Sequence, residues 1–310
     1  MPNRRTFLKQ AAFGAGLFLT GGFPIESFAG EKRTKLTILH TNDVHSRLES
    51  FPNDGSKYAG QGGVASRASL ISRIRSTEEH VLLFDSGDMF QGTPYFNLYK
   101  GEPEIKAMSL MGYDAATMGN HDFDAGVEGF AAQLPHANFP ILISNYDFSG
   151  TVLEGKTRPW KIFRKGDLKI GVFGLGIELK GLVPESAFAG TQYLNPIRTA
   201  RLTAAALKQQ GCDFIICLSH LGFEYADRKI SDMILAKETE NIDLILGGHT
   251  HTFLDQPAVV RNRNGAEVLI NQVGWAGLRL GRLDYEFSSK KSTKLTNSYS
   301  VIIRKQTRAW

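Results

Sequence analysis

Hydrophobic and polar positions form short blocks along the chain, and their spacing predicts strands and helices in turn. Apolar runs with the length of buried strands occur at residues 36–39, 81–84, 115–118, 141–144, 214–218 and 244–246. Helices are predicted at residues 65–75, 104–111, 127–134 and 199–209. A hairpin is predicted for residues 163–164 and 168–173, with its turn at Lys165-Gly166-Asp167.

The order of these elements indicates the fold class. Strands predicted at 268–271 and 278–287 follow residues 244–246 without long helices between them, so part of the pairing has to be antiparallel. We therefore expect an α/β fold with a mixed sheet, or with two sheets packed together and helices outside. Residues 299–304 are expected to add one edge strand at most.

The first residues have the features of an export signal and not of a folded element. Arg4 and Arg5 precede an uncharged stretch at 10–25, and a small-x-small cleavage pattern ends at Ala29. Glycines interrupt this stretch, and it falls short of the roughly 20 apolar residues that span a bilayer. We expect residues 1–29 to be a twin-arginine export signal that directs the protein to the periplasm, with no stable membrane anchor after cleavage.

Net charge and cysteine positions bear on two questions, namely whether the protein binds nucleic acid and whether it contains a disulfide bond. Removal of residues 1–29 takes away three basic residues and one acid, so the formal charge falls from +5 to +3. A nearly balanced charge gives no support for a nucleic-acid partner. Cys212 and Cys217 lie on one predicted strand, roughly 16 Å apart and beyond disulfide reach, so we expect buried thiols. Residues 30–310 are predicted to be one domain with a large core.

Side chains that bind metals occur in five clusters, each at the end of an apolar run. The clusters are Asp43-Val44-His45, Gly87-Asp88, Gly119-Asn120-His121-Asp122-Phe123-Asp124, Ser219-His220 and Gly247-Gly248-His249-Thr250-His251. Loops at the carboxyl ends of strands are where α/β sheets place their sites. Alone, the first three clusters are also compatible with ordinary polar turns, and a histidine pair such as His249 and His251 with a packed core feature. Together they supply enough oxygen and imidazole ligands for two adjacent metal ions.

The residue types suggest different tasks. Asp88 is the natural bridge between two metals because one carboxylate contacts both, whereas Asp85 is expected to support the loop. Asn120 offers an amide oxygen that adds no charge. His121 is expected to face the substrate, with Asp124 holding its imidazole in one tautomer and favouring its protonated form.

The order of these motifs resembles that of the calcineurin-like metallophosphoesterases. Ile38-Leu39-His40-Thr41-Asn42-Asp43-Val44-His45, taken with the cluster around Asn120, looks like the 5′-nucleotidase branch. The resemblance extends over residues 36–285 and implies a four-layer α-β-β-α sandwich with two mixed β-sheets. It implies one metal held by Asp43, His45, Asp88 and His251, and a second held by Asp88, Asn120, His220 and His249. His121 and Asp124 match the catalytic pair.

The reaction implied is metal-dependent hydrolysis of a phosphoester. Paired metals lower the pKa of a bound water, and the resulting hydroxide attacks phosphorus while His121 assists the leaving group. The ligand types suit Mn²⁺, Fe, Co²⁺ or Zn²⁺ and do not choose among them. A phosphomonoester, which includes a nucleotide, is the expected substrate. The alternatives are a phosphodiester or sugar-nucleotide pyrophosphate, a sulfur–sulfonate bond as in relatives of the same branch, and a non-enzymatic metal or phosphate-binding role.

The sequence departs from the 5′-nucleotidase pattern after the catalytic region. Full-length members carry a second domain that stacks the nucleotide base between aromatic residues, and residues 286–310 are too few to form it. We therefore expect no C-terminal nucleotide-binding domain here. Either the protein acts alone on small phosphoesters, or a separate polypeptide supplies the missing domain.

Overall fold

The structure, a computed structural model, describes residues 33–288 and 293–304. The predicted export signal, residues 1–29, lies outside the described residues, so its assignment stays a prediction. Within the described part of the chain, no helix has the length and apolar character needed to cross a membrane.

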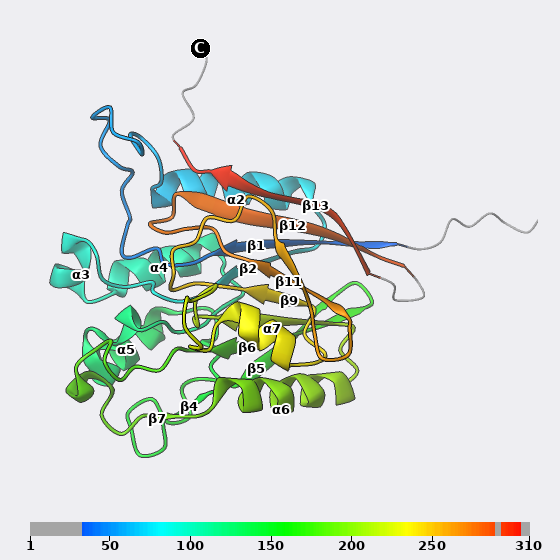
Figure 1. The fold of residues 1–310 in the computed structure, drawn as a ribbon. Helices are drawn as coiled ribbons and strands as arrows, with labels where there is room; N and C mark the ends of the chain where they lie inside the picture. Colours follow the sequence, from blue (N-terminus) through cyan, green and yellow to red (C-terminus); the bar gives the residue numbers. More distant parts are fainter. Residues whose placement is uncertain (1–32, 289–292, 305–310) are drawn as a thin grey trace, which may run out of the picture. The chain divides into compact units, whose positions relative to one another are not determined.

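The first sheet has five strands in the order β13-β12-β1-β2-β3 (Figure 1). Strands β1 (Thr34–Thr41), β2 (Val81–Asp85) and β3 (Ala115–Ala116) run parallel to one another. Strands β12 (Arg279–Phe287) and β13 (Thr293–Ile302) add antiparallel to β1, with β13 at the edge. The predicted edge strand is therefore confirmed, although it begins earlier than the expected residue 299.

The second sheet has six strands in the order β10-β11-β9-β8-β6-β5. Its four central strands are parallel: β11 (Glu267–Asn271), β9 (Leu244–Leu246), β8 (Phe214–Ser219) and β6 (Leu168–Leu175). The edge strands β10 (Ala258–Arg261) and β5 (Trp160–Lys165) are antiparallel to their neighbours, and β5 with β6 forms the predicted hairpin. A separate pair joins β4 (Tyr146–Asp147) and β7 (Gln192–Tyr193).

Apolar side chains from the facing sides of the two sheets form a core between them. Successive side chains of a strand point to opposite faces, so one strand contributes to two cores. In β1, Leu36 and Ile38 join the cluster that also contains Ile170 and Ile216 of the second sheet, whereas Leu39 joins the cluster under the helices. Both sheets are mixed, and the predicted arrangement of helices over two packed sheets is confirmed.

Helices cover the outer face of each sheet. Helices α2 (Val64–Thr77) and α4 (Glu102–Met111) pack on the first sheet, and α5 (Gly126–Gln133) contributes to the same apolar cluster. Helices α6 (Pro196–Gln209) and α7 (Asp232–Glu238) pack on the second. Four shorter helices complete the fold: α3 (Pro94–Tyr99), η1 (His121–Phe123), η2 (Leu134–His136) and η3 (Glu185–Phe188).

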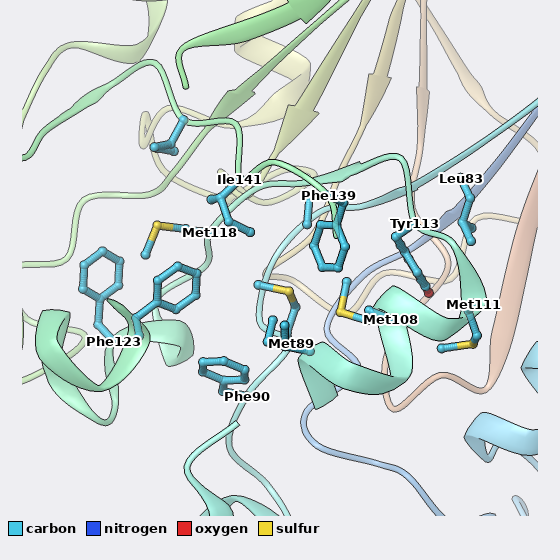
Figure 2. Packing of buried hydrophobic residues seen from close by; sticks show 14 of the residues in the cluster. Leu83, Met89, Phe90, Met108, Met111, Tyr113, Met118, Phe123, Phe139 and Ile141 are labelled. Carbon is cyan, nitrogen blue, oxygen red and sulfur yellow. The ribbon is translucent and has the colours of Figure 1, made fainter. Parts of the chain in front are cut away.

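The core under α4 and α5 is rich in methionine and phenylalanine, as Figure 2 shows. Met89 and Phe90, which directly follow Asp88, insert into this core beside Met108 of α4. The loop that carries Asp88 is therefore fixed by apolar packing on its far side. Cys212 and Cys217 are buried free thiols, as predicted.

One predicted strand is wrong. Residues 141–144 form two isolated bridges and no continuous strand. The backbone of this segment divides its hydrogen bonds among three partners: Leu142 N–H donates to Ala116, Ile143 N–H to Arg158 and Ser144 N–H to Gly174. Because no neighbour runs beside the segment for more than a residue or two, an apolar run here does not produce a ladder.

The core between the sheets gives a stability prediction. Phe84 is fully buried in that core, with its ring centroid 5.7 Å from that of Phe163. Phe84→Ala is expected to lower the free energy of unfolding by about 3–5 kcal/mol, through lost burial and a residual cavity. Urea unfolding of the metal-free protein measures this loss. Leu110→Ala is the matched control because Leu110 is 90% exposed, and a similar loss there would contradict the assignment of the core.

Candidate metal centre

The five ligand clusters meet where the parallel strands of the two sheets end. Asp43, Asp88 and Asn120 follow β1, β2 and β3 of the first sheet, and His220 and His249 follow β8 and β9 of the second. A hydrogen bond joins the two sides, because the Ser86 hydroxyl donates to the Leu246 carbonyl oxygen at 2.8 Å. The fold therefore brings together side chains that are up to 208 positions apart in sequence, from Asp43 to His251.

Six of the seven predicted ligands form two groups of three. The first group is Asp43, His45 and His251, and the second is Asp88, His220 and His249; within each group the donor atoms lie within 4.8 Å of one another.

Distances within and between the groups are short. His251 Nε2 lies 3.0 Å from His45 Nε2 and 3.3 Å from Asp43 Oδ1. In the second group, His220 Nε2 lies 3.1 Å from Asp88 Oδ2. The groups adjoin, because Asp88 Oδ2 is also 3.9 Å from His45 Nε2. Asp88 thus lies close to donors of both groups, and its bridging role stays a prediction.

Hydrogen bonds fix the tautomers of two of the imidazoles. His220 Nδ1 lies 2.7 Å from the Ser86 carbonyl oxygen, and His45 Nδ1 lies 3.3 Å from that of Phe90. Because a carbonyl oxygen only accepts, each Nδ1 carries a proton, so Nε2 is the nitrogen of each ring that faces the donor groups. Without metal, Asp88 favours a second proton on His220 Nε2, and a metal bound there would displace it.

One buried polar atom at this centre, Asn120 Oδ1, lacks a hydrogen-bond partner among the described residues. Buried polar atoms are almost always paired, so an unpaired amide oxygen beside carboxylates and imidazoles fits metal ligation. Mixed imidazole, carboxylate and amide donors are also a set that divalent transition metals accept. The residues present therefore fit two divalent cations, while the ligand assignments themselves stay predictions.

The backbone at the centre is held in an uncommon conformation. Positive φ angles, which L-residues rarely adopt, occur at five of the seven predicted ligands: Asp43, His45, Asp88, His249 and His251. Such conformations persist where the surrounding structure fixes them, and they concentrate at functional sites.

The pKa values of the histidines at the centre depend on their burial and on the neighbouring carboxylates. Burial would lower the pKa of His220, but Asp88 and Asp43 outweigh it and raise the pKa to about 10. Burial also dominates at His249, whose pKa falls to about 4, and it lowers the pKa of His45. His45 and His249 are therefore neutral near pH 7, which is the state that binds metal.

The pair His121 and Asp124 lies beside the two groups and outside them. His121 Nδ1 is 3.0 Å from Asp124 Oδ2, and the His121 ring centroid is 5.3 Å from that of His45. The hydrogen bond that His121 donates to Asp124 raises the pKa of His121 against the opposing effect of partial burial. His121, His45 and His251 line one cavity of about 240 Å³. His121 and Asp124 belong to neither donor group, and their catalytic role stays a prediction.

Asp122 has a structural role that sequence reasoning missed. Its fully buried carboxylate accepts four backbone N–H bonds, from Asp88 and Gly119 at one oxygen and from Met89 and Phe90 at the other. It therefore ties the Asp88 loop to the Asn120 loop. The sequence shows only that Asp122 lies between His121 and Asp124. Hydrogen bonds from one side chain to the backbone of two loops produce no residue spacing from which they could be predicted.

Asn42 and Asp85 give similar support to the loops. The Asn42 amide donates to Asp43 Oδ2 at 2.6 Å and to the Gly274 carbonyl oxygen at 2.6 Å. Asp85 accepts from Gly87 N–H at 2.9 Å, in agreement with the predicted role in supporting its loop. Gly119 allows the loops to approach, because a Cβ there would clash with Asp88 Oδ1.

Comparison with known proteins places this geometry in a family. Residues 36–253 match the sequence profile of the calcineurin-like phosphoesterases. The chain belongs to the calcineurin-like phosphoesterase family. The members are metal-dependent hydrolases of phosphoric esters, in keeping with the two donor groups found here.

Similar proteins within the family carry 5′-nucleotidase names. The chain is 34% identical over 291 residues to a snake venom 5′-nucleotidase of Gloydius brevicauda, covering 87% of this chain and 48% of that protein. The structure of a 5′-nucleotidase precursor from Thermus thermophilus is similar with a TM-score of 0.78 and 31% identity, covering 87% of this chain and 55% of that one.

A third similar structure is that of the Haemophilus influenzae NAD nucleotidase. It has a TM-score of 0.77 and 29% identity, and the match covers 88% of this chain and 51% of that one. The chain thus spans about half the length of the curated relatives it matches.

The shared carboxylate gives a prediction about metal content. Asp88→Asn removes a charge that lies between the two donor groups, so the variant is expected to lose at least one metal per chain. Elemental analysis by mass spectrometry, with circular dichroism as a check on folding, measures the effect. Asp147→Asn is the matched control, since Asp147 lies in β4 and outside both groups. Full metal content in Asp88→Asn would contradict the bridging position.

Proposed function

We propose that this chain hydrolyses phosphomonoesters with two divalent metal ions, and that His121 and Asp124 assist the leaving group. The observation that carries the proposal is the adjoining pair of donor groups, with His121 lining the same cavity as His45 and His251. We assign one ion to Asp43, His45, Asp88 and His251, and the other to Asp88, Asn120, His220 and His249. Mn²⁺, Zn²⁺, Fe and Co²⁺ all suit these donors.

The chemistry divides between the ions and the chain. When bound, two divalent cations acidify water and neutralise the charge that develops on phosphate oxygens. The chain holds the ligands rigid through the Asp122 clamp and the hydrogen bonds of Ser86 and Phe90. A fixed geometry of this kind removes the cost of reorganising the site during the reaction.

Departure of the alcohol is the step that requires a proton. His121 Nδ1 is engaged with Asp124, which leaves Nε2 as the nitrogen that can donate. The pKa of His121 is raised by that bond, so its protonated form is favoured. General acid catalysis of this kind contributes about 10²–10⁴ in rate.

The names of the relatives favour nucleotides as the substrate class. Several carry 5′-nucleotidase names, and we propose nucleoside monophosphates and similar small phosphomonoesters for this chain. A second candidate is cleavage of a pyrophosphate bond, because a similar structure is that of an NAD nucleotidase. A separate chain that supplies further substrate contacts is also part of the proposal, and co-purification from the native compartment tests it.

Export completes the proposal. Arg4 and Arg5 with the following uncharged stretch support delivery through the twin-arginine pathway, and residues 30–310 would then form the exported catalytic domain. This pathway carries folded proteins, so the metals would be bound before export. Purification from the native compartment would retain those metals and any stable partner chain.

His121→Ala gives a direct prediction. We expect metal content to be unchanged and kcat to fall about 10²–10⁴-fold on an alkyl phosphate, whose poor leaving group needs a proton. The loss on 4-nitrophenyl phosphate is expected to be much smaller, because that leaving group departs as an anion. His136→Ala is the control, since His136 lies in η2 away from both donor groups. Normal turnover of the alkyl phosphate by His121→Ala would exclude the proposed role.

Removal and return of metal test the activity itself. Protein purified from its native compartment is assayed on nucleoside monophosphates, an alkyl phosphate, a phosphodiester and NAD, before and after treatment with a chelator. We expect phosphomonoester hydrolysis that chelation abolishes and added divalent metal restores. Activity that survives complete metal removal, or hydrolysis confined to NAD and the diester, would contradict the proposal.

A further inference from the structure

The cavity beside His121 has a second wall that the proposed chemistry does not use. This cavity, of about 240 Å³, is lined by His45, His121 and His251 and also by Arg47, Gln91 and Trp275, which are called its second wall here. Arg47 and Trp275 belong to neither donor group. If His121 protonates the leaving group, that group lies next to the cavity that Arg47 and Trp275 also line.

The turn that carries Trp275 is fixed to the metal centre through its backbone. Ala276 N–H donates to the Asp43 carbonyl oxygen at 2.7 Å, and the Asn42 side chain donates to the Gly274 carbonyl oxygen at 2.6 Å. Ala276 has φ 55°, a left-handed conformation that favours glycine. A residue other than glycine in this conformation indicates that the surroundings determine the turn, and hence the place of Trp275.

Aromatic contacts hold the indole ring itself. The Trp275 ring is nearly parallel to that of His251, with an interplanar angle of 9° and centroids 5.9 Å apart. Phe51 and Tyr58 meet Trp275 edge-on, at centroid distances of 6.0 and 6.4 Å. These are favourable offset and edge-to-face arrangements, so the indole is oriented before any ligand arrives.

The loop that supplies Phe51 and Tyr58 is anchored as well. Phe51 N–H donates to the Gln61 carbonyl oxygen at 2.8 Å, which closes the loop on itself. Gly62 N–H donates to the Ile303 carbonyl oxygen at 2.7 Å, which attaches the loop to the segment after β13. The aromatic cluster of Phe51, Tyr58 and Trp275 is therefore held by three separate parts of the chain: the loop 51–61, the turn at Trp275 and the segment after β13.

Two donors at this wall have no protein acceptor among the described residues. The Arg47 guanidinium lies 4.3 Å from the centroid of Phe51, and no carboxylate of the described chain pairs with it. The Trp275 indole N–H likewise has no acceptor there. A tryptophan that only fills a core is fully buried with its N–H paired, whereas Trp275 is half-buried beside an open cavity.

We propose that Trp275 and Arg47 form a leaving-group subsite within this chain, and that it binds a planar aromatic ring of the substrate alcohol. The indole offers a stacking face, and the guanidinium recognises ring carbonyl oxygens or the π face. The cavity is smaller than the about 300 Å³ typical of the smallest drug-sized sites, so a single ring is favoured. This inference rests on the proposed phosphomonoesterase activity and names its substrate class as pyrimidine nucleotides and similar esters.

The test compares substrates that differ only in the ring. Uridine 5′-monophosphate has a planar conjugated base, 5,6-dihydrouridine 5′-monophosphate has the same base without conjugation, and ribose 5-phosphate has none. All three release the phosphate from a sugar hydroxyl. Metal-loaded wild-type protein is expected to prefer the planar base over the reduced one by about 5- to 150-fold in kcat/KM, the range of base–aromatic stacking.

Trp275→Leu keeps an apolar side chain of moderate size and removes the aromatic face. The preference for uridine 5′-monophosphate over its dihydro form is expected to fall to near unity, whereas Trp275→Phe retains part of it. Metal content and urea unfolding are measured in both variants, because Trp275 also contacts His251. Trp160→Leu, the same substitution in β5, is the control and keeps the preference. Calorimetric titration with uridine and with dihydrouridine measures the difference in their binding affinities without any turnover.

The possible results of these assays distinguish failure of the leaving-group subsite from failure of the proposed phosphomonoesterase activity. Equal kcat/KM for all three substrates in the wild type, or a preference that survives Trp275→Leu, overturns the subsite while the phosphomonoesterase activity stands. If the metal-loaded protein hydrolyses none of the three, ribose 5-phosphate included, the proposed function is contradicted and the inference falls with it.

Discussion

Two buried carboxylates that share a small space with imidazoles are the constraint on which the structure depends. Asp43 and Asp88 are almost fully excluded from solvent, and their oxygens lie 3.1–4.0 Å from the nearest Nε2 atoms. Buried charge is costly unless it is balanced. His45 and His249 are neutral, so His220, whose pKa Asp88 and Asp43 raise, is the imidazole that offsets this charge without metal, and divalent cations would offset it when bound. The strained backbone around these side chains maintains the arrangement.

The two sheets position these side chains because the carboxyl ends of their parallel strands meet at the metal centre. A parallel strand delivers its following loop to the same edge as its neighbours, which is why five clusters separated in sequence converge. The apolar packing of Met89 and Phe90 and the Asp122 clamp then fix the loops from behind. Stability and function are coupled here, because the same hydrogen bonds that satisfy buried N–H groups also position Asp88 and Asn120.

Much of this was predictable from sequence because strand length and strand ends leave local patterns. The apolar runs before Asp43, Asp88 and His220 predict both the strands and the place of the ligands. The segment 141–144 has the same pattern, yet its backbone pairs with three partners, and partner choice is a tertiary property. The Asp122 clamp and the wall at Trp275 were likewise missed, since both depend on contacts between distant loops.

We propose that two metal ions occupy the two adjoining donor groups of this chain. Anomalous X-ray diffraction from crystals of natively purified protein, recorded across the Mn, Fe, Co and Zn edges, tests this occupancy. We expect two peaks, one among Asp43, His45 and His251 and one among Asn120, His220 and His249, with Asp88 in contact with both. A single peak, no peak, or metal bound by other residues would contradict it.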